Sequence, residues 1–349
     1  MSYPRGWAAN LPLVPIARPA RWGLVVLAAT LVATSAVIYA RLQLPSAPSI
    51  AVAAARASLT PRDLQHSPWY RLRVLSQGVS FHDAVAAAPV PDIPASAGIL
   101  VDVDTGTILW QHNEHEKLPP ASTIKVLTSM VALENFAPDH PVTVTPDALF
   151  QAGDETKMYL KAGQTLSVQE LLTGMLTVSA NDAADTLAID TVGMERYVGA
   201  MNAQAAALHL HDTHVTTPVG LSDPRQYSSA YDLAVMASID ENVFPLFAGI
   251  VRTPYVLLPA NATHPAFGLD NINALLGMYP AAVGIKTGWT GDAGACEIGM
   301  AVREGHRLLS VLLNGNRVYT ETRRLLDWGF VQEGLPSQLP TPNPSPRPG

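Results

Sequence analysis

The chain has little cysteine and little charge, and each shortage excludes a class of protein. Cys296 is the one cysteine among 349 residues, so no disulfide forms within the chain and a cysteine-stapled scaffold is excluded. It lies in a strand-like run, 295–300, where we expect a buried small side chain rather than a catalytic thiol. Charged residues make up 15% and the net charge is -7, which argues against nucleic-acid binding.

Apolar residues, by contrast, are abundant, and one stretch is long enough to cross a membrane. Residues 22–40 carry no charge, and as a helix they would extend roughly 30 Å, the thickness of a bilayer's hydrocarbon core. Arg5, Arg18 and Arg21 precede the stretch, whereas the first acidic residue is Asp63. Because positive residues stay on the cytoplasmic side, residues 1–21 are predicted to be cytoplasmic and the rest of this single-pass protein extracytoplasmic.

A cleaved signal peptide is the alternative for residues 22–40. Its apolar core usually spans about 7–15 residues and ends at an Ala-x-Ala-like site. This run is longer, and Tyr39-Ala40-Arg41 is a poor cleavage junction, although Ala51-Val52-Ala53 leaves cleavage open. An uncleaved signal anchor is the prediction.

The remainder divides into a spacer, a catalytic domain and a tail. Residues 41–94 are rich in Ala, Pro and Ser, which predicts a spacer. Residues 95–332 form the predicted folded domain, and 333–349 a Pro-rich tail expected to be disordered from Gly334 on.

Within 95–332 the pattern predicts an α+β fold, with strands first, helices in the middle, then strands and a last helix. Residues 97–103 and 107–110 are expected to form a hairpin around Asp104-Thr105-Gly106. Further strands are expected at 295–302 and 307–313. The expected helices are 122–136, 168–178, 194–208, 230–239 and 319–328, the last ending at Gly329.

Ser122-Thr123-Ile124-Lys125 is the first of three short motifs with chemical meaning. Residues three apart on a helix share a face, so the Lys125 ammonium can reach the Ser122 hydroxyl. A serine hydroxyl becomes a good nucleophile when a neighbouring base accepts its proton. Alone the motif is weak evidence for catalysis, because a serine at a helix N-cap followed by a solvated lysine has the same sequence pattern.

Two more motifs follow in order. Ser179-Ala180-Asn181 comes directly after an apolar helix and offers a second hydroxyl and an amide. Lys286-Thr287-Gly288 reads as an edge strand whose Lys and Thr can face a carboxylate, and whose Gly allows close approach of a substrate backbone. An ordinary turn explains either motif in isolation.

Together the three motifs resemble the penicillin-recognising serine acyl-transferases. Over roughly 95–330 the chain looks like their low-molecular-weight D-alanyl-D-alanine carboxypeptidase branch, peptidase family S11. Pro120-Ala121 before Ser122, Gly220-Leu221, 226–230 and the run 325–330 support that resemblance. It implies an antiparallel sheet flanked by helices, with an all-helical subdomain, here preceded by one transmembrane helix.

The resemblance also implies roles. Ser122 would attack the penultimate D-alanine carbonyl of a peptidoglycan stem peptide, Lys125 would take its proton, and Ser179 would pass a proton to the departing D-alanine. Asn181, Lys286, Thr287 and Gly288 would bind substrate, and the backbone N–H groups of Ser122 and Trp289 would hold the oxyanion. No metal or organic cofactor is implied. β-Lactams would acylate Ser122, and the place of action would be the outer face of a bacterial cell membrane, in peptidoglycan biosynthesis and cell shape.

One departure concerns the arginine that the family usually carries near its last helix to bind the substrate carboxylate. Arg317 is the candidate, although its register against the family is not fixed by the residues. A solvated turn arginine is the alternative.

Other functions share parts of this pattern. A class A β-lactamase needs a glutamate between the second and third motifs, and Glu195 and Glu241 lack the expected neighbours. A D,D-endopeptidase acting on cross-links, or a sensor that stays acylated by β-lactams, remains open. His209-Leu210-His211-Asp212-Thr213-His214 is expected to be a surface run, since no carboxylate cluster with metal-ligand spacing supports it.

Overall fold

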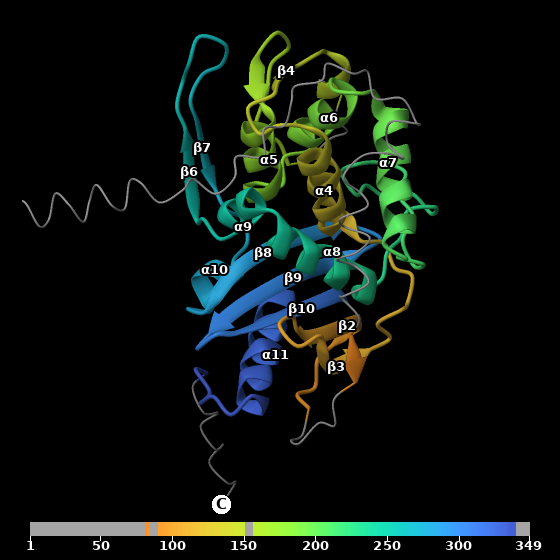
Figure 1. Cartoon of the computed structure of the whole chain (residues 1–349), viewed down its shortest axis with the longest axis vertical. Helices are drawn as coiled ribbons and strands as arrows, with labels where there is room; N and C mark the ends of the chain where they lie inside the picture. Colours follow the sequence, from red (N-terminus) through yellow and green to blue (C-terminus); the bar gives the residue numbers. More distant parts are fainter. Residues whose placement is uncertain (1–80, 84–89, 151–155, 340–349) are drawn as a thin grey trace, which may run out of the picture. The chain divides into compact units, whose positions relative to one another are not determined.

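The computed structural model describes residues 81–83, 90–150 and 156–339. A six-stranded sheet of order β1-β3-β2-β10-β9-β8 lies at the centre of this part of the chain (Figure 1). Its strands are β1 (His82–Asp83), β2 (Ala95–Asp102), β3 (Thr107–His112), β8 (Ala282–Thr290), β9 (Gly294–Arg303) and β10 (His306–Gly315). All neighbours pair antiparallel except β1 with β3. The predicted mixed fold with an antiparallel sheet is confirmed.

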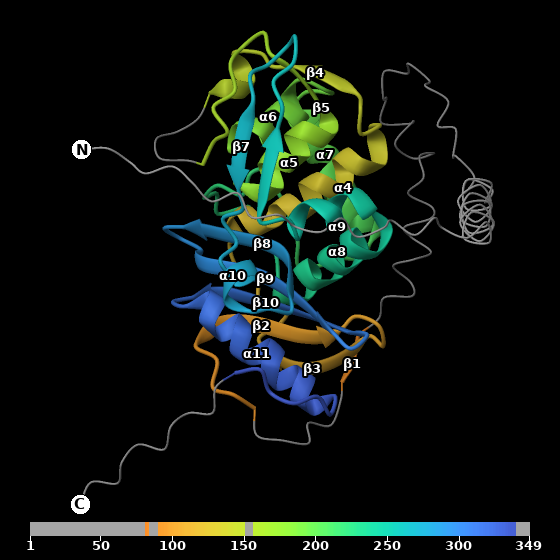
Figure 2. The ribbon, with the colours of Figure 1, turned by 90° about the vertical axis from the view of Figure 1, so that its left-hand side faces the viewer.

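Helices cover both faces of the sheet. One face carries a mostly helical region made of α4 (Lys125–Asn135), α5 (Val168–Thr177), α6 (Asn181–Ile189), α7 (Met194–Ala207), α8 (Ala230–Val243) and α9 (Pro245–Val251). The opposite face carries α11 (Val318–Gln332), with α10 (Leu275–Met278) beside it (Figure 2). Short pieces complete the fold: η1 (Ala121–Ile124), β4 (Pro141–Thr143), η2 (Asp147–Leu149), β5 (Thr165–Ser167), β6 (Tyr255–Leu258) and β7 (Phe267–Asp270).

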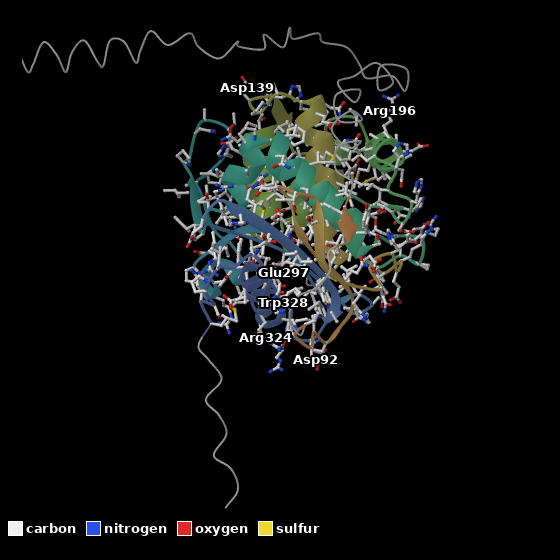
Figure 3. All side chains as sticks on the ribbon, turned by 60° about the horizontal axis from the view of Figure 1, so that its bottom comes forward. Asp92, Asp139, Arg196, Glu297, Arg324 and Trp328 are labelled. Carbon is white, nitrogen blue, oxygen red and sulfur yellow. The ribbon has the colours of Figure 1, made fainter. Side chains whose placement is uncertain are left out.

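Because both faces are covered, the central strands are apolar on both sides. Successive side chains of a strand point to opposite faces. In β2, Ile99 and Val101 join the large cluster under the helical region, whereas Leu100 joins a second cluster under α11. Figure 3 shows the same division, with Asp139 and Arg196 on the helical side and Arg324 and Trp328 on the α11 side.

The predicted helices and strands fall within a few residues of the observed ones, with one clear error. The last helix does not end at Gly329. This glycine is instead needed for packing, because a Cβ there would lie 2.7 Å from Leu308 and 2.8 Å from Leu100. Gly329 therefore lets α11 approach the sheet, and the helix runs on to Gln332. Gly334, with φ +83°, is the left-handed residue that follows its end.

Both ends of the described range differ from the predicted domain limits. β1 lies inside the range 41–94 that was predicted to be a spacer. At the other end, the Pro336 carbonyl accepts from Arg303 (2.6 Å) and Gln338 N–H donates to Asp327 (2.8 Å). Residues 335–339 are thus held against α11, unlike the prediction of disorder from Gly334 on.

The predicted transmembrane segment, 22–40, lies outside the described residues. Within them, no single helix has both the length and the apolar character needed to span a bilayer. The α8–α9 pair meets both criteria when taken together, with a bend of 109° between its halves.

Candidate active site

Ser122 lies in the turn that leads into α4. Residues 121–124 form η1, and Lys125 begins the α-helix directly after it. This places the two side chains of the first motif one turn apart, and Lys125 Nζ is 2.9 Å from Ser122 Oγ. The predicted contact within the motif is present, although its helix begins as a 3-10 turn.

Gly220, in a different segment of the chain, packs closely against this turn. It has φ +88°, and a Cβ at that position would clash with the carbonyl oxygen of Ala121. Ala121 itself has φ +47°, an uncommon conformation for a residue with a side chain. The nucleophile turn is therefore held by a close backbone contact that only glycine permits.

Lys125 is fully buried and surrounded by oxygen atoms of the second motif. Its Nζ is 2.5 Å from Asn181 Oδ1, 3.1 Å from the Ser179 carbonyl and 3.3 Å from Ser179 Oγ. Ser179 has φ +59° at the junction between α5 and α6. Strained backbone of this kind gathers at functional sites, and here it directs both oxygens of Ser179 toward one amine.

Lys286 on edge strand β8 reaches the same serine from the other side. Its Nζ donates to Ser179 Oγ (2.9 Å) and to the Thr287 carbonyl (2.8 Å). Burial lowers the pKa of Lys286 from 10.5 to about 7, against an opposing effect of Glu297. The structure thus joins Ser122, Lys125, Ser179 and Lys286 in one chain of hydrogen bonds, with Asn181 attached at Lys125.

Gly288 brings β8 against the nucleophile. A Cβ at Gly288 would lie 2.8 Å from Ser122 N and 3.0 Å from Thr123 N. The predicted reason for this glycine was approach of a substrate backbone, and the structure adds approach of the protein's own backbone. The predicted oxyanion donors, Ser122 N–H and Trp289 N–H, belong to the two segments that meet here, while the Trp289 side chain is 72% exposed.

The side chains of Thr287 and Arg317 have no hydrogen bond to Ser122, Lys125, Ser179 or Lys286 among the residues that the structure describes. Thr287 is buried on β8 and pairs with Glu297 of β9. Arg317 is exposed at the N-cap of α11, where its carbonyl accepts the N–H of Glu321 (3.1 Å), and its side chain has no hydrogen bond or ion pair to another residue that the structure describes. Its assignment as the carboxylate-binding arginine stays a prediction.

Sequence reasoning missed the segment that braces the second motif. Asn181 N–H donates to the Thr156 carbonyl (2.8 Å), and Thr156 Oγ1 donates to the Ser179 carbonyl (2.8 Å). The carboxylate of Asp182, itself 1% exposed, accepts N–H groups of the same segment. The only sequence signal was an acidic residue, Asp182, directly after the second motif.

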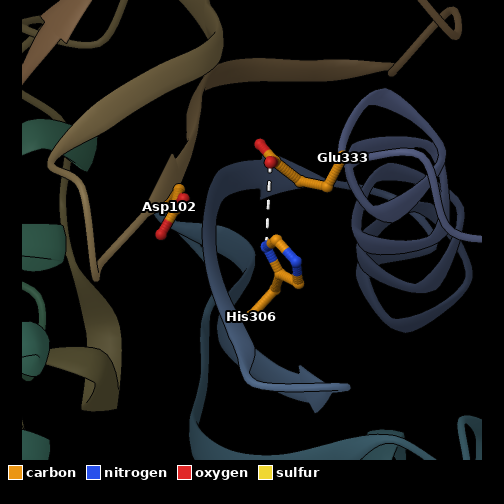
Figure 4. Close-up of side chains that lie close together, drawn as sticks. All are labelled: Asp102, His306 and Glu333. Carbon is orange, nitrogen blue, oxygen red and sulfur yellow. Dashed lines mark ion pairs between the residues drawn. The ribbon is translucent and has the colours of Figure 1, made fainter.

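Among the described residues, one grouping brings three metal-ligand atoms within 4.8 Å of one another, namely Asp102, His306 and Glu333 (Figure 4). His306 Nδ1 is 3.7 Å from Glu333 Oε2, and Asp102 Oδ1 accepts the N–H of Asp104 in the β2–β3 turn. These contacts are those of a turn and a surface ion pair, away from the hydrogen-bond chain of Ser122.

The histidine run lies at the surface near His115. His209 and His211 line a hollow together with His115 and Asp212, and His115 Nδ1 is 3.0 Å from Asp212 Oδ2. His214 Nδ1 contacts the Arg225 carbonyl. Cys296 is buried, and burial raises the pKa of its thiol to about 11, as expected of an inert side chain.

The two glutamates considered for β-lactamase chemistry are placed elsewhere. Glu195 is exposed in the first turn of α7, and Glu241 pairs with Arg252 at 2.5 Å near the end of α8. Neither side chain has a contact with Ser122 or Lys125 in the part of the chain that the structure covers.

Comparison with known proteins gives consistent matches. Residues 83–317 match the family described as D-alanyl-D-alanine carboxypeptidase, Peptidase S11. D-alanyl-D-alanine carboxypeptidase DacB2 of Mycobacterium tuberculosis is 36% identical over 253 residues, covering 70% of this chain and 85% of that protein. DacD of Escherichia coli is 35% identical over 269 residues, covering 73% and 68%.

Solved structures agree. The crystal structure of a D-alanyl-D-alanine carboxypeptidase from Mycobacterium tuberculosis superposes with a TM-score of 0.67 at 34% identity, covering 73% of this chain and 98% of that one. The Streptomyces K15 DD-transpeptidase gives 0.65 at 26% identity, covering 70% and 100%.

Proposed function

The chain belongs to the D-alanyl-D-alanine carboxypeptidase family, Peptidase S11, and from that membership we propose that it removes the terminal D-alanine of peptidoglycan stem peptides. The observation that carries the proposal is the hydrogen-bonded chain of Ser122, Lys125, Ser179 and Lys286. It places a nucleophile, a base, a relay hydroxyl and a cation in one site.

Acylation begins at Ser122. Its Oγ attacks the carbonyl carbon of the penultimate D-alanine while Lys125, 2.9 Å away, takes the hydroxyl proton. The carbonyl oxygen becomes an oxyanion, which the N–H groups of Ser122 and Trp289 stabilise; removing one such donor typically costs about 2.7–4 kcal/mol of barrier. Collapse forms the ester and breaks the C–N bond.

The leaving amine needs the proton that Lys125 took. Ser179 Oγ lies 3.3 Å from Lys125 Nζ and 2.9 Å from Lys286 Nζ, so its hydroxyl can receive a proton from either amine and pass one on. D-alanine then departs with a neutral or protonated amine. Water then hydrolyses the ester with the help of the same groups, whose proton transfers run in reverse order, and this restores Ser122.

Substrate binding uses the other polar groups of the site. Lys286 and Thr287 bind the terminal carboxylate, so the enzyme prefers a free C-terminus, and Asn181 holds the peptide backbone. Arg317 would add a second cation if its exposed side chain turned toward β8. All proposed steps use side chains and backbone groups of the chain itself. β-Lactams acylate Ser122 because they resemble the D-Ala-D-Ala end.

The test is release of free D-alanine from a peptide ending in D-Ala-D-Ala. The proposal predicts many turnovers per enzyme. One equivalent of bound acyl group without further release would instead indicate a β-lactam sensor. Cleavage of cross-linked dimers in preference to free pentapeptides would indicate an endopeptidase. Transfer of the acyl group to an added amine would indicate a transpeptidase, the activity named for the Streptomyces K15 relative.

We also propose that residues 22–40 tether the enzyme to the membrane, with its catalytic domain outside. Support comes from the uncharged length of that run and the arginines before it. Deleting 22–40 should move penicillin-labelled protein from the membrane fraction to the soluble fraction. Label that stays in the membrane fraction after the deletion would contradict the tether.

A further inference from the structure

Tyr159 belongs to a short segment that is fastened to the second motif at several points. Met158 N–H and Leu160 N–H, on either side of Tyr159, both donate to the Asp182 carboxylate at 3.0 Å. Two residues further back, Thr156 is bonded to both Ser179 and Asn181. The backbone at Tyr159 is thereby fixed relative to the catalytic groups.

The backbone of Tyr159 is strained, and its ring contributes nothing to the core. Its φ is +62°, a conformation that is a real outlier for a bulky side chain. Met158 and Leu160 are 4% and 6% exposed, whereas Tyr159 is 79% exposed. The fold therefore buries both neighbours and holds an aromatic ring in solvent. Glycine would be less strained in this backbone conformation.

The place of the ring follows from the same contacts. The Asp182 carboxylate accepts the N–H groups on either side of Tyr159, and Asn181, the residue before Asp182, contacts Lys125 through its Oδ1. Adding bond lengths and hydrogen-bond distances puts the Tyr159 Cα at most about 13 Å from the Asn181 Cα. Tyr159 thus lies on a segment bonded to the second motif, whereas Lys286 comes from a different segment, β8.

We propose that Tyr159 is a substrate-binding residue that determines specificity for the part of the stem peptide on the N-terminal side of the scissile bond. The inference rests on the proposed function, in which β8 binds the terminal carboxylate. A ring held beside the second motif, on a segment other than β8, would then meet the residues that precede D-Ala-D-Ala. A fixed, exposed aromatic ring covers peptide surface with little loss of entropy, which explains why the strained conformation is kept.

Two substrates of different length test the proposal. A muramyl pentapeptide extends past the site, whereas an N-acetylated D-Ala-D-Ala dipeptide does not. Tyr159→Ala should raise the KM of the pentapeptide roughly tenfold, with kcat within about twofold, and leave the dipeptide and penicillin acylation unchanged. Tyr159→Phe should keep the wild-type KM. Tyr255→Ala, which removes an exposed tyrosine on β6, is the control and should change neither substrate.

A stability measurement separates this role from a structural one. Tyr159→Gly relieves the strained φ, so its Tm should equal or exceed the wild-type value while the pentapeptide KM still rises. The inference is overturned if Tyr159→Gly lowers Tm and leaves the KM unchanged, or if both substrates lose affinity equally with Tyr159→Ala. If the wild type releases D-alanine from neither substrate, the proposed function itself fails, and this inference with it.

Discussion

Lys125 is fully buried, and the atoms around its amine determine which proton transfers it can take part in. Nζ lies within 3.3 Å of Ser122 Oγ, of Asn181 Oδ1 and of both Ser179 oxygens. An ammonium has three protons to donate, whereas a neutral amine has one lone pair that can accept the Ser122 proton. The crowding of oxygens around one nitrogen fits a group that exchanges protons with two hydroxyls.

Replacing Lys125 by Met should keep the buried shape and remove the base. The rate constant of penicillin acylation should fall about 10²–10⁴-fold, the usual contribution of general base catalysis. Thermal unfolding, measured alongside, should show a folded protein, because Met fills the same buried volume. An acylation rate within a few-fold of wild type would mean that another group takes the Ser122 proton.

The pH dependence of substrate affinity should follow Lys286. Burial lowers the pKa of Lys286 to about 7, so its ammonium is charged at pH 6 and loses its proton as the pH rises through 7. The KM of a peptide ending in a free carboxylate should therefore increase between pH 6 and 8. A peptide ending in D-alaninamide lacks that carboxylate and should show no such increase; equal pH profiles would show that Lys286 does not bind the carboxylate.

The sequence predicted these residues because three short motifs fix both chemistry and order. It did not predict Thr156 or Asp182, whose importance arises from a loop that returns to the second motif. The sequence also did not predict where the Arg317 side chain points. A shift of one residue in the start of the helix changes which side chain faces the site.

At the scale of elements, close backbone contacts decide the geometry of the site. η1, β8 and the segment around Gly220 meet at Ala121 and Ser122, at distances that a Cβ would prevent. Periodicity predicted the helix after Ser122, but it carries no information about a 3-10 first turn or a glycine 98 positions later. Such features depend on how elements pack rather than on their own residue pattern.

Gly220→Ala should disturb the nucleophile turn. The new Cβ clashes with the Ala121 carbonyl and also occupies a left-handed conformation, so we expect a loss of stability of about 2–4 kcal/mol and slower penicillin acylation. Gly305→Ala is the matched control, since it has φ +92° but open space around it. It should cost about 1 kcal/mol and leave acylation unchanged. Equal losses in both variants, by thermal unfolding, would contradict a role for the Ala121 contact.

At the scale of the whole domain, several carboxylic acids are buried, and at Glu297 the Lys286 amine opposes the effect of burial. Burial raises the pKa of Glu134 to about 8, and it raises the pKa values of Asp240 and Glu297 well above their ordinary range. Glu297 is fully buried on β9, in the central sheet (Figure 3). These groups hold protons in the folded state that the unfolded chain releases above about pH 4.5.

The sign of the pH effect on stability follows from that proton count. Between about pH 4.5 and 8 the folded state binds more protons than the unfolded state at Glu134, so its contribution to stability is lost as pH rises. Glu134→Gln should flatten the fall of Tm between pH 5 and 8 by several degrees. A Tm profile parallel to wild type would show that Glu134 is ionised in the folded protein.

The central claim is that Ser122 forms the acyl-enzyme, and the most direct measurement is mass spectrometry of the protein after reaction with penicillin. The account predicts one penicilloyl adduct per chain on the peptide containing Ser122, and none in Ser122→Ala. An adduct that persists in Ser122→Ala, or that maps to another residue of the wild type, would contradict it.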